Sequence, residues 1–490
     1  MKEKSLKLNA VLNITKQCMN LLFPLITFPY SSRILNADGI GKVNFALSIV
    51  SYFSLLAGLG IGRYATREAA KIRDDRLLLS KFTKEIVTIN FSTTVISYLL
   101  FFIALFAVPR FSEYRALLCI CSSTILFSTF GMEWLYNAKE EYVYTTVRGM
   151  CFQVLSLILL FVLVKTKDDY VKYASINVIS SVGSNILNFI NIRKLVDFRV
   201  KVKKEIKKHF RPILILFASS VAVSLYNELD KTMIGFLAND EQVGYYSAST
   251  KITKLVIALI TAVLTVISPR LSNYAETNKE KFFELLEKAF NIILMLSLPF
   301  MFGLVVMARP LTILFCGENF EPSVRIMQVM SVIIFMIPLA TFCSTQIFIP
   351  LRKDKYTFYP VLIGAIVNAV FNVFLILKLG GFGAGIATVI AESSVTFASF
   401  VLVKKSEVSV RKLFRYFWQY LIASIIMAVA VYFEIKTAQK NFIFTVLGIF
   451  LGVLVYFLVL LILKNKYLLS FWKKNKREKV ELQNFVNPSP

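Results

Sequence analysis

Long apolar runs recur along the whole chain and constrain its fold more than any other feature. A membrane-spanning helix needs about 20 mostly apolar residues, because the hydrocarbon core of a bilayer is about 30 Å thick. Of the 490 residues, 56% are hydrophobic, and only short connections separate the runs. The sequence therefore predicts an all-α polytopic membrane protein with no inserted water-soluble domain. About fourteen transmembrane helices are expected, over residues 10–34, 43–62, 85–108, 115–137, 146–164, 171–192, 212–238, 243–268, 284–308, 324–350, 356–378, 383–403, 412–433 and 442–463.

The basic residues indicate how the chain is oriented. Lys and Arg number 56 against 30 acidic residues, a formal net charge of +26. These charges are confined mostly to short loops between apolar runs, so nucleic acid is not an expected partner. With both termini in the cytoplasm, the cytoplasmic side holds about 40 of the 56 basic residues and the outer loops hold about 12. Because Lys and Arg are enriched in cytoplasmic loops, we expect both termini inside and an even number of helices.

A short motif occurs twice, before the second and the eighth predicted helices. Residues 34–41 read ILNADGIG and residues 237–244 read LANDEQVG, at an offset of 203 residues. The matched positions are Asn36 with Asn239, Asp38 with Glu241, and Gly41 with Gly244. Repeats of this kind predict two parallel six-helix bundles with a central site between them. The expected division is an N-terminal bundle (1–200), a C-terminal bundle (201–405), an additional helix pair (406–465) and a basic cytoplasmic tail (466–490).

Two lysines lie deep in a predicted span. Lys251 and Lys254 are roughly 12 and 16 Å along the segment that starts at residue 243, so Lys254 falls near the bilayer midplane. A charge there costs about 3 kcal/mol on insertion scales, and it is expected to face a cavity, a counter-charge or a substrate. An antiparallel hairpin would place Asp230, Lys231 and Lys251 at one depth. An ion pair that holds this hairpin together is the alternative to a substrate cavity.

Further polar residues follow predicted spans at helical spacing. Lys16 either lines a cavity or extends to the interface, and Arg33 either lines a cavity or anchors the outer interface. The asparagines either contact substrate or join helices by hydrogen bonds. Glu392 lies near the middle of its span, where a carboxyl group is costly, and is a candidate proton or cation site. The expected cavity-lining asparagines are Asn13, Asn20, Asn177, Asn368 and Asn372.

Signals of enzymatic or metal chemistry are absent from the sequence. There is no Walker A motif, no H-E-x-x-H and no convincing carboxylate dyad, so we expect neither an enzyme nor a cofactor. The six cysteines are scattered and the single histidine, His209, falls in a basic loop, so no metal site is expected. Transport would then be facilitated or driven by an ion gradient or the membrane potential. The segment 63–84 is either an amphipathic helix on the inner leaflet or a solvated connector.

Four stretches of the chain are distinctive: PYSSRILNADGIGKV (29–43), LGIGRYATRE (59–68), LDKTMIG (229–235) and VGYYSAS (243–249). They resemble bacterial Wzx-type oligosaccharide flippases of the multidrug/oligosaccharidyl-lipid/polysaccharide exporter superfamily. The resemblance implies a protein of the bacterial cytoplasmic membrane that moves undecaprenyl-diphosphate-linked oligosaccharides to the outer leaflet for O-antigen or capsule synthesis. It also implies contact with membrane lipid, and it leaves H⁺ or Na⁺ coupling and association with polymerase and chain-length proteins open.

The expected site combines these residues with that cargo. A diphosphate needs cations, which would come from Lys16, Arg33, Lys231, Lys251 and Lys254. Ion coupling or counter-charge would come from Glu228, Asp230 and Glu392. A lipid II flippase and an ion-coupled multidrug antiporter of the same superfamily are alternatives, although an antiporter would carry a more acidic cavity. A membrane polysaccharide polymerase is a weaker alternative, because the chain has neither a large external loop nor an acidic metal-binding motif.

Overall fold

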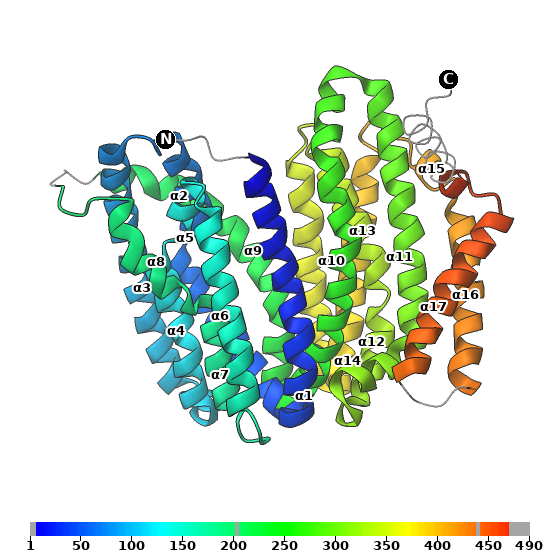
Figure 1. Ribbon diagram of the computed structural model, residues 1–490, viewed down its shortest axis with the longest axis horizontal. Coiled ribbons are helices and arrows are strands. Elements are labelled where there is room, and N and C mark those ends of the chain that lie inside the picture. Colours follow the sequence, from blue (N-terminus) through cyan, green and yellow to red (C-terminus); the bar gives the residue numbers. More distant parts are fainter. Residues whose placement is uncertain (1–5, 201–204, 438–441, 470–490) are drawn as a thin grey trace, which may run out of the picture. The chain divides into compact units, whose positions relative to one another are not determined.

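Helices joined by short connections make up the described residues of the computed structural model, which are 6–200, 205–437 and 442–469 (Figure 1). Each of the fourteen predicted spans falls on a helical segment, so the all-α polytopic prediction is confirmed. Within the described residues, ten helices are long and apolar enough to cross a membrane. Of these ten, Lys355–Val403 contains two predicted spans, and Phe23–Lys71 contains the second predicted span and the part of the first from residue 23 onwards. The remaining two predicted spans fall on α9 and on α7 to α8, which a π-helical turn interrupts.

The chain divides into two compact units. The first comprises residues 1–247, 315–320 and 372–381. It contains the first nine α-helices, the first turns of α10, and short pieces of the later chain. Its elements are α1 (Leu6–Gly58), α2 (Ile61–Lys71), α3 (Arg76–Ala107), η1 (Pro109–Tyr114), α4 (Arg115–Gly131), α5 (Glu133–Ala138), α6 (Tyr142–Leu163), α7 (Tyr170–Val178), η2 (Ile179–Gly183), α8 (Asn185–Asn191), η3 (Ile192–Lys194), α9 (Lys207–Leu237), the start of α10 (Asp240–Thr277) and η4 (Glu318–Phe320).

The second unit comprises residues 248–314, 321–371 and 382–490. Within it, α16 packs along α17, which is the apolar helix pair expected after the second bundle. The division into two six-helix bundles stays a prediction. The elements of this unit are the rest of α10, α11 (Lys279–Cys316) up to residue 314, α12 (Pro322–Met330), α13 (Ile333–Phe342), η5 (Cys343–Phe348), α14 (Lys355–Val403) without residues 372–381, α15 (Val410–Leu413), α16 (Phe417–Thr437) and α17 (Phe442–Ile462).

Two of the longest elements, α1 and α14, are pairs of helices joined at a single non-helical residue. In α1 the junction is Asn36, with φ 57° and ψ −176°. In α14 it is Gly380, with φ 57° and ψ −134°. Positive φ is open to glycine and less costly for asparagine than for most other residues. Each junction joins two predicted spans with no loop between them.

Helix α1 is central to the first unit, where it packs against α3, α4, α6 and α9. Its second half is mostly apolar, and the buried positions include Ile40, Phe45 and Ile49. These three side chains lie on successive turns of α1 and pack as apolar surface against the neighbouring helices. This packing fixes the polar side chains that α1 and α9 carry along the same length.

The segment after α1 forms a short amphipathic helix, but its apolar face does not need lipid to cover it. Helix α2 buries Ile61, Tyr64, Ala65 and Ala69 in an apolar cluster of the protein, with Phe82 and Trp134. Its basic residues remain exposed. The helix was expected as one of two interpretations, and the structure places its apolar side on protein.

Candidate functional site

A buried carboxylate forms the centre of the polar residues in the first unit. Asp230, on α9, is 6% exposed and accepts hydrogen bonds from the hydroxyl of Tyr246 and from the amide nitrogen of Asn372, the latter at 2.6 Å. Tyr246 lies in the first turns of α10 and Asn372 in the middle of α14. A carboxyl group in a membrane interior requires such donors, because no water there replaces them. The structure thus brings together two predicted residues, Asp230 and Asn372, that lie 142 positions apart.

An ion pair on α9 brackets Asp230 in the sequence. Lys231 Nζ is 2.8 Å from Glu228 Oε2, and both side chains are partly exposed. The two residues are three positions apart on α9, a spacing at which side chains meet on the helix surface. The positive charge of Lys231 is therefore balanced by a residue of its own helix.

Hydrogen-bonded hydroxyl groups connect this polar region of α9 to α1. Thr232 Oγ1 lies 3.1 Å from Tyr52 Oη and 3.0 Å from Ser48 Oγ. Ser48 and Tyr52 are four residues apart, so they share one face of α1. Sequence reasoning missed both residues, although this spacing within an apolar helix was a usable signal.

The other predicted residues are distributed over both units. In the first unit Arg33 is exposed and Asn177 is half-buried. In the second, Lys254 is exposed, Lys251 is half-buried, and Asn368 and Glu392 are buried. The side chains of Asn13, Lys16 and Asn20 lie outside the described residues. Roles for these residues in a cavity stay predictions.

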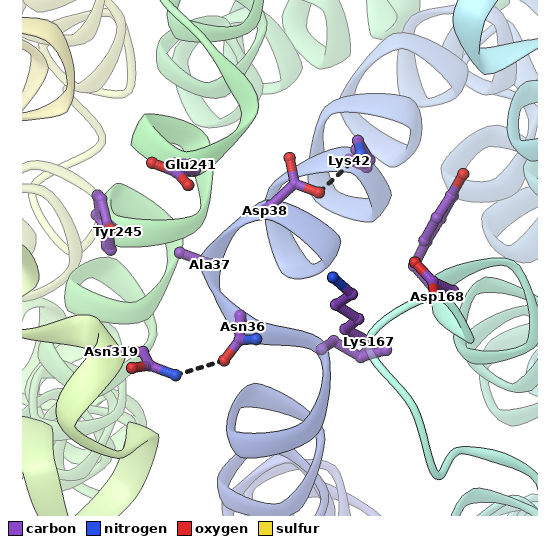
Figure 2. Close-up of a pocket in the computed structure, with 11 residues that line it drawn as sticks. Asn36, Ala37, Asp38, Lys42, Lys167, Asp168, Glu241, Tyr245 and Asn319 are labelled. Carbon is purple, nitrogen blue, oxygen red and sulfur yellow. Dashed lines mark hydrogen bonds and ion pairs between the residues drawn. The ribbon is translucent and has the colours of Figure 1, made fainter.

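A polar pocket opens at the break in α1, and we call it the break pocket (Figure 2). Its volume is about 470 Å³. The amide nitrogen of Asn319 donates to Asn36 Oδ1 at 2.7 Å, directly at the non-helical residue. Figure 2 shows Glu241 and Tyr245 on the α10 side of the break. The lining residues are Leu35, Asn36, Ala37, Asp38, Lys42, Lys167, Asp168, Tyr170, Glu241, Tyr245 and Asn319.

The repeated glycines bring two backbones together beside this pocket. A Cβ atom added to Gly41 would lie 1.7 Å from the carbonyl oxygen of Asp240. A Cβ atom added to Gly244 would lie 2.0 Å from the carbonyl oxygen of Ala37. No other residue type fits either position without a backbone shift. The two copies of the motif are therefore packed against each other, which gives their matched glycines a physical reason.

The start of α10 is further fixed by hydrogen bonds. The hydroxyl of Tyr114 donates to the Asp240 carboxylate, 2.6 Å from Oδ1, and Arg110 lies 3.6 Å from the same oxygen. Gln242 Oε1 accepts a hydrogen bond of 2.9 Å from the backbone N–H of Gly381, next to the break in α14. One short segment of α10 is thus tied to the break in α1 and to the break in α14.

A second cluster of titratable groups is buried in the first unit, and we call it the His209 cluster. His209 was expected in a basic loop, but it lies in the first turn of α9 and is 2% exposed. Its Nε2 is 2.9 Å from Glu85 Oε2, and its Nδ1 is 2.7 Å from the hydroxyl of Tyr64. The backbone N–H of Glu205 donates to the other oxygen of Glu85 at 2.8 Å. The basic neighbours of His209 misled the sequence prediction, because its apolar surroundings come from other helices.

An apolar groove runs along the helix pair of the second unit. It is bounded by α11, α16 and α17 and has a volume of about 330 Å³. Pro299, Gly303 and Met307 line it on the α11 side, and Gly448 and Gly452 line it on the α17 side. The small glycine residues leave room that bulky side chains would fill. Such a groove accommodates hydrocarbon and offers little to a polar ligand.

Comparison with protein families gives two matches. The family described as polysaccharide biosynthesis protein matches residues 6–275. A second family, described as MatE, matches residues 216–374. The first match covers more than half of the chain.

Similar proteins match most of the chain. A protein of Escherichia coli (strain K12), provisionally named an O-antigen transporter, is 22% identical over 422 residues, which is 83% of this chain and 98% of that protein. A protein of Shigella dysenteriae with the same provisional name is 25% identical over 396 residues, 79% of this chain and 97% of that one. The lipid II flippase MurJ, in an inward closed conformation, has a TM-score of 0.74 at 18% identity, covering 94% of this chain and 99% of that chain. This last similarity shows the fold alone.

Proposed function

The chain belongs to the polysaccharide biosynthesis protein family, and we propose that it moves a lipid-linked oligosaccharide across the bacterial cytoplasmic membrane. The cargo would be an undecaprenyl-diphosphate-linked repeat unit, transferred from the cytoplasmic to the outer leaflet before polymerisation into O-antigen or capsule. The observation that carries this proposal is the family match over residues 6–275, joined to relatives, matched over almost their whole length, that are provisionally named O-antigen transporters.

The chemistry of the described residues supports this cargo. A diphosphate is a compact dianion that lysines contact as point charges, without the fixed geometry of an arginine pair. Lys251 and Lys254 are the candidates on α10, and neither is fully buried. The polyprenyl tail would occupy apolar surface such as the groove along α11, α16 and α17. Hydroxyl and amide groups of the polar region around Asp230 would form hydrogen bonds with the sugar hydroxyls.

The driving force would come from an ion gradient or the membrane potential. Asp230 and Glu392 are the buried carboxyl groups proposed to bind or balance a coupling cation, H⁺ or Na⁺. The carboxylate of Asp230 already accepts hydrogen bonds from Tyr246 and Asn372, which would hold it in place for such a cation. Alternating access of two helix bundles would then expose the site to either side in turn. Both termini would lie in the cytoplasm, and the protein would not be an enzyme.

The alternative cargoes differ in what they require of the cavity. The MatE match over residues 216–374 favours an ion-coupled antiporter as the second candidate. A drug cation would be repelled by Lys251 and Lys254, whereas a lipid diphosphate would be attracted. Lipid II shares the diphosphate and differs only in its sugars, so cargo competition separates it from an O-antigen precursor.

The experiment that tests this function is deletion of the gene in a strain that lacks other flippases. We expect lipid-linked oligosaccharide to accumulate on the cytoplasmic leaflet, measured by its protection from an enzyme or lectin added outside. An unchanged pool with polymer still reaching the surface would refute the proposal.

Charge reversal within the chain sharpens that test. Lys251→Glu or Lys254→Glu should abolish export in a complementation assay while the protein stays inserted at its normal level, because a carboxylate repels the diphosphate. Lys254→Arg, which keeps the positive charge, is the matched control and should retain export. Full complementation by both glutamate variants would remove these lysines from the mechanism.

A further inference from the structure

We propose that the break pocket is a saccharide-binding site that takes a neutral or amino sugar of the cargo. This inference rests on the proposed function and adds a sugar subsite to it. The subsite would lie on the outer side of the membrane, given the orientation expected from the distribution of basic residues. It concerns the pocket around Asn36 and is separate from the hydrogen-bonded network of Asp230.

The pocket has the size and the functional groups of a small-molecule site. Its volume of about 470 Å³ falls within the range of roughly 300–1,000 Å³ that is typical of ligand pockets. Sugar hydroxyls both donate and accept hydrogen bonds, so they require both kinds of partner close together. Asn36 and Asn319 offer amides, while Tyr170 and Tyr245 offer rings and hydroxyl groups. The carboxylates and ammonium groups of the lining add stronger acceptors and donors.

The charges of the lining disfavour a phosphate. Two lysines, Lys42 and Lys167, face three carboxylates, Asp38, Asp168 and Glu241, which leaves one excess negative charge. Lys42 is moreover held by Asp38, with Nζ 2.7 Å from Oδ2, and it lies 5.2 Å from the centre of the Tyr170 ring. Its charge is already balanced. An anionic ligand would therefore meet a net repulsive lining.

A metal ion fits the pocket no better. In the described part of the chain, no group of three or more His, Cys, Asp or Glu side chains is arranged to hold a metal. The three carboxylates come from α1, from the loop before α7 and from the start of α10, and they do not converge. A ligand with many neutral polar groups matches this spread of acceptors better than a point charge.

The walls of the pocket are fixed before any ligand arrives. The hydrogen bond from Asn319 holds Asn36 in its non-helical conformation. Gly41 and Gly244 hold the start of α10 against α1. The loop that carries Lys167 and Asp168 is closed by Asp169, which accepts from the backbone N–H groups of Lys165 and Thr166 at 2.9 and 2.8 Å. Such preorganisation lowers the entropy cost of binding.

The ionisation of Asp169 supports the rigidity of that loop. Lys172 lies 2.6 Å from its carboxylate, and together with the backbone N–H groups of Lys165 and Thr166 it holds the pKa of Asp169 well below its usual range. The carboxylate therefore keeps accepting these hydrogen bonds at neutral pH.

The sequence repeat connects the two sides of the pocket. Asp38 and Glu241 occupy matched positions of the two motif copies, and both line this cavity. Their glycine partners pack the two copies together. The repeat therefore builds one pocket from two related segments, one on α1 and one on α10.

Saccharide binding is tested with the full-length protein in lipid nanodiscs, by ligand-observed saturation-transfer NMR. The probes are glucose, N-acetylglucosamine, glucosamine and glucuronic acid, with inorganic phosphate and Ca²⁺ as the competing ligand classes. We expect glucose or an amino sugar to bind, and phosphate and Ca²⁺ not to compete. Absence of binding by every sugar, or competition by phosphate or Ca²⁺, would overturn the inference.

Exposed lining residues provide variants that leave the core intact. Glu241→Ala and Asp168→Ala each remove an exposed carboxylate acceptor and should weaken sugar binding about tenfold. Asp74→Ala, which removes an exposed carboxylate outside the pocket lining, is the matched control and should leave binding unchanged. Equal binding by wild type and both pocket variants would place the sugar elsewhere.

The readouts separate this inference from the proposed function. Leaflet transfer of intact cargo with no sugar binding at the pocket would refute the subsite alone. Sugar binding that is lost in both pocket variants, in a protein that transfers no lipid-linked cargo, would refute the flippase function and leave the subsite in place.

Discussion

The break pocket and the His209 cluster both gather charged and hydrogen-bonding side chains in the first unit, but they differ in burial. Glu85 and His209 are 1% and 2% exposed, and their polar atoms meet protein partners. In the break pocket the side chains of Lys42 and Asp38 are 30% and 48% exposed. Groups that are buried and satisfied by protein stabilise the fold, whereas groups at a rigid open surface keep bonding capacity for a ligand.

The largest loss of stability is expected in the His209 cluster, which is the buried region of the two. Glu85→Ala would leave the buried imidazole of His209 without its acceptor and would remove the acceptor of the Glu205 backbone N–H, at a cost of about 3 kcal/mol or more. The unfolding temperature of the purified protein in detergent should fall by several degrees. Glu113→Ala, which removes an exposed carboxylate, should leave it unchanged. Equal unfolding temperatures for the two variants would show that the His209 cluster does not stabilise the fold.

The next largest loss of stability is expected at Gly244, where the start of α10 touches the backbone of α1. Gly244→Ala places a methyl group 2.0 Å from the carbonyl oxygen of Ala37, so α1 and the start of α10 must separate. Overpacking of this kind costs about 1–3 kcal/mol, and the same variant should lose sugar binding. Gly62→Ala, where a Cβ atom meets nothing within 4 Å, is the control and should be neutral or slightly stabilising. Normal unfolding and sugar binding in Gly244→Ala would contradict the packing that we describe.

A smaller difference in stability is expected from two substitutions at Asn36, which test the backbone conformation at the break in α1. Asn36→Ala and Asn36→Gly both lose the hydrogen bond to Asn319, but only alanine retains a Cβ atom at φ 57°. We expect the alanine variant to be less stable than the glycine variant by about 1 kcal/mol in denaturant unfolding. A glycine variant no more stable than the alanine variant would mean that Asn36 is not strained.

The smallest effect is expected for the half-exposed pair of the pocket. Asp38→Asn breaks the ion pair with Lys42, which is exposed enough that such pairs contribute about 0.5 kcal/mol or less. Its unfolding temperature should stay close to that of the wild type, while Glu85→Gln, the matched change in the His209 cluster, should lower it. A similar large loss in both variants would erase the distinction between the two regions.

The helices were predictable because hydropathy and chain length act locally. Each predicted span needed only its own residues, and so did the short amphipathic segment α2. The motif repeat also indicated that Gly41 and Gly244 were related. The sequence did not indicate that their backbones touch, because that contact joins residues about 200 positions apart.

The partners of the site were harder to predict for the same physical reason. Asp230 was identified from its own helix, but its donors Tyr246 and Asn372 come from two others. His209 sits among basic neighbours that indicate a loop, yet Phe82 and Tyr64 from other helices bury it. Lys167 and Asp168 stand in a short loop with no periodicity, so only the fold assigns them to a pocket.

The most direct test of the transport function uses purified protein in liposomes that contain a fluorescent undecaprenyl-diphosphate-linked oligosaccharide. Transfer between leaflets is measured by quenching of the outer leaflet. We expect the wild type to accelerate transfer far above protein-free vesicles and Lys254→Glu to remain at the protein-free rate. A wild-type rate equal to that of protein-free vesicles, under an imposed proton or sodium gradient as well as without one, would contradict the assignment of this chain as a flippase.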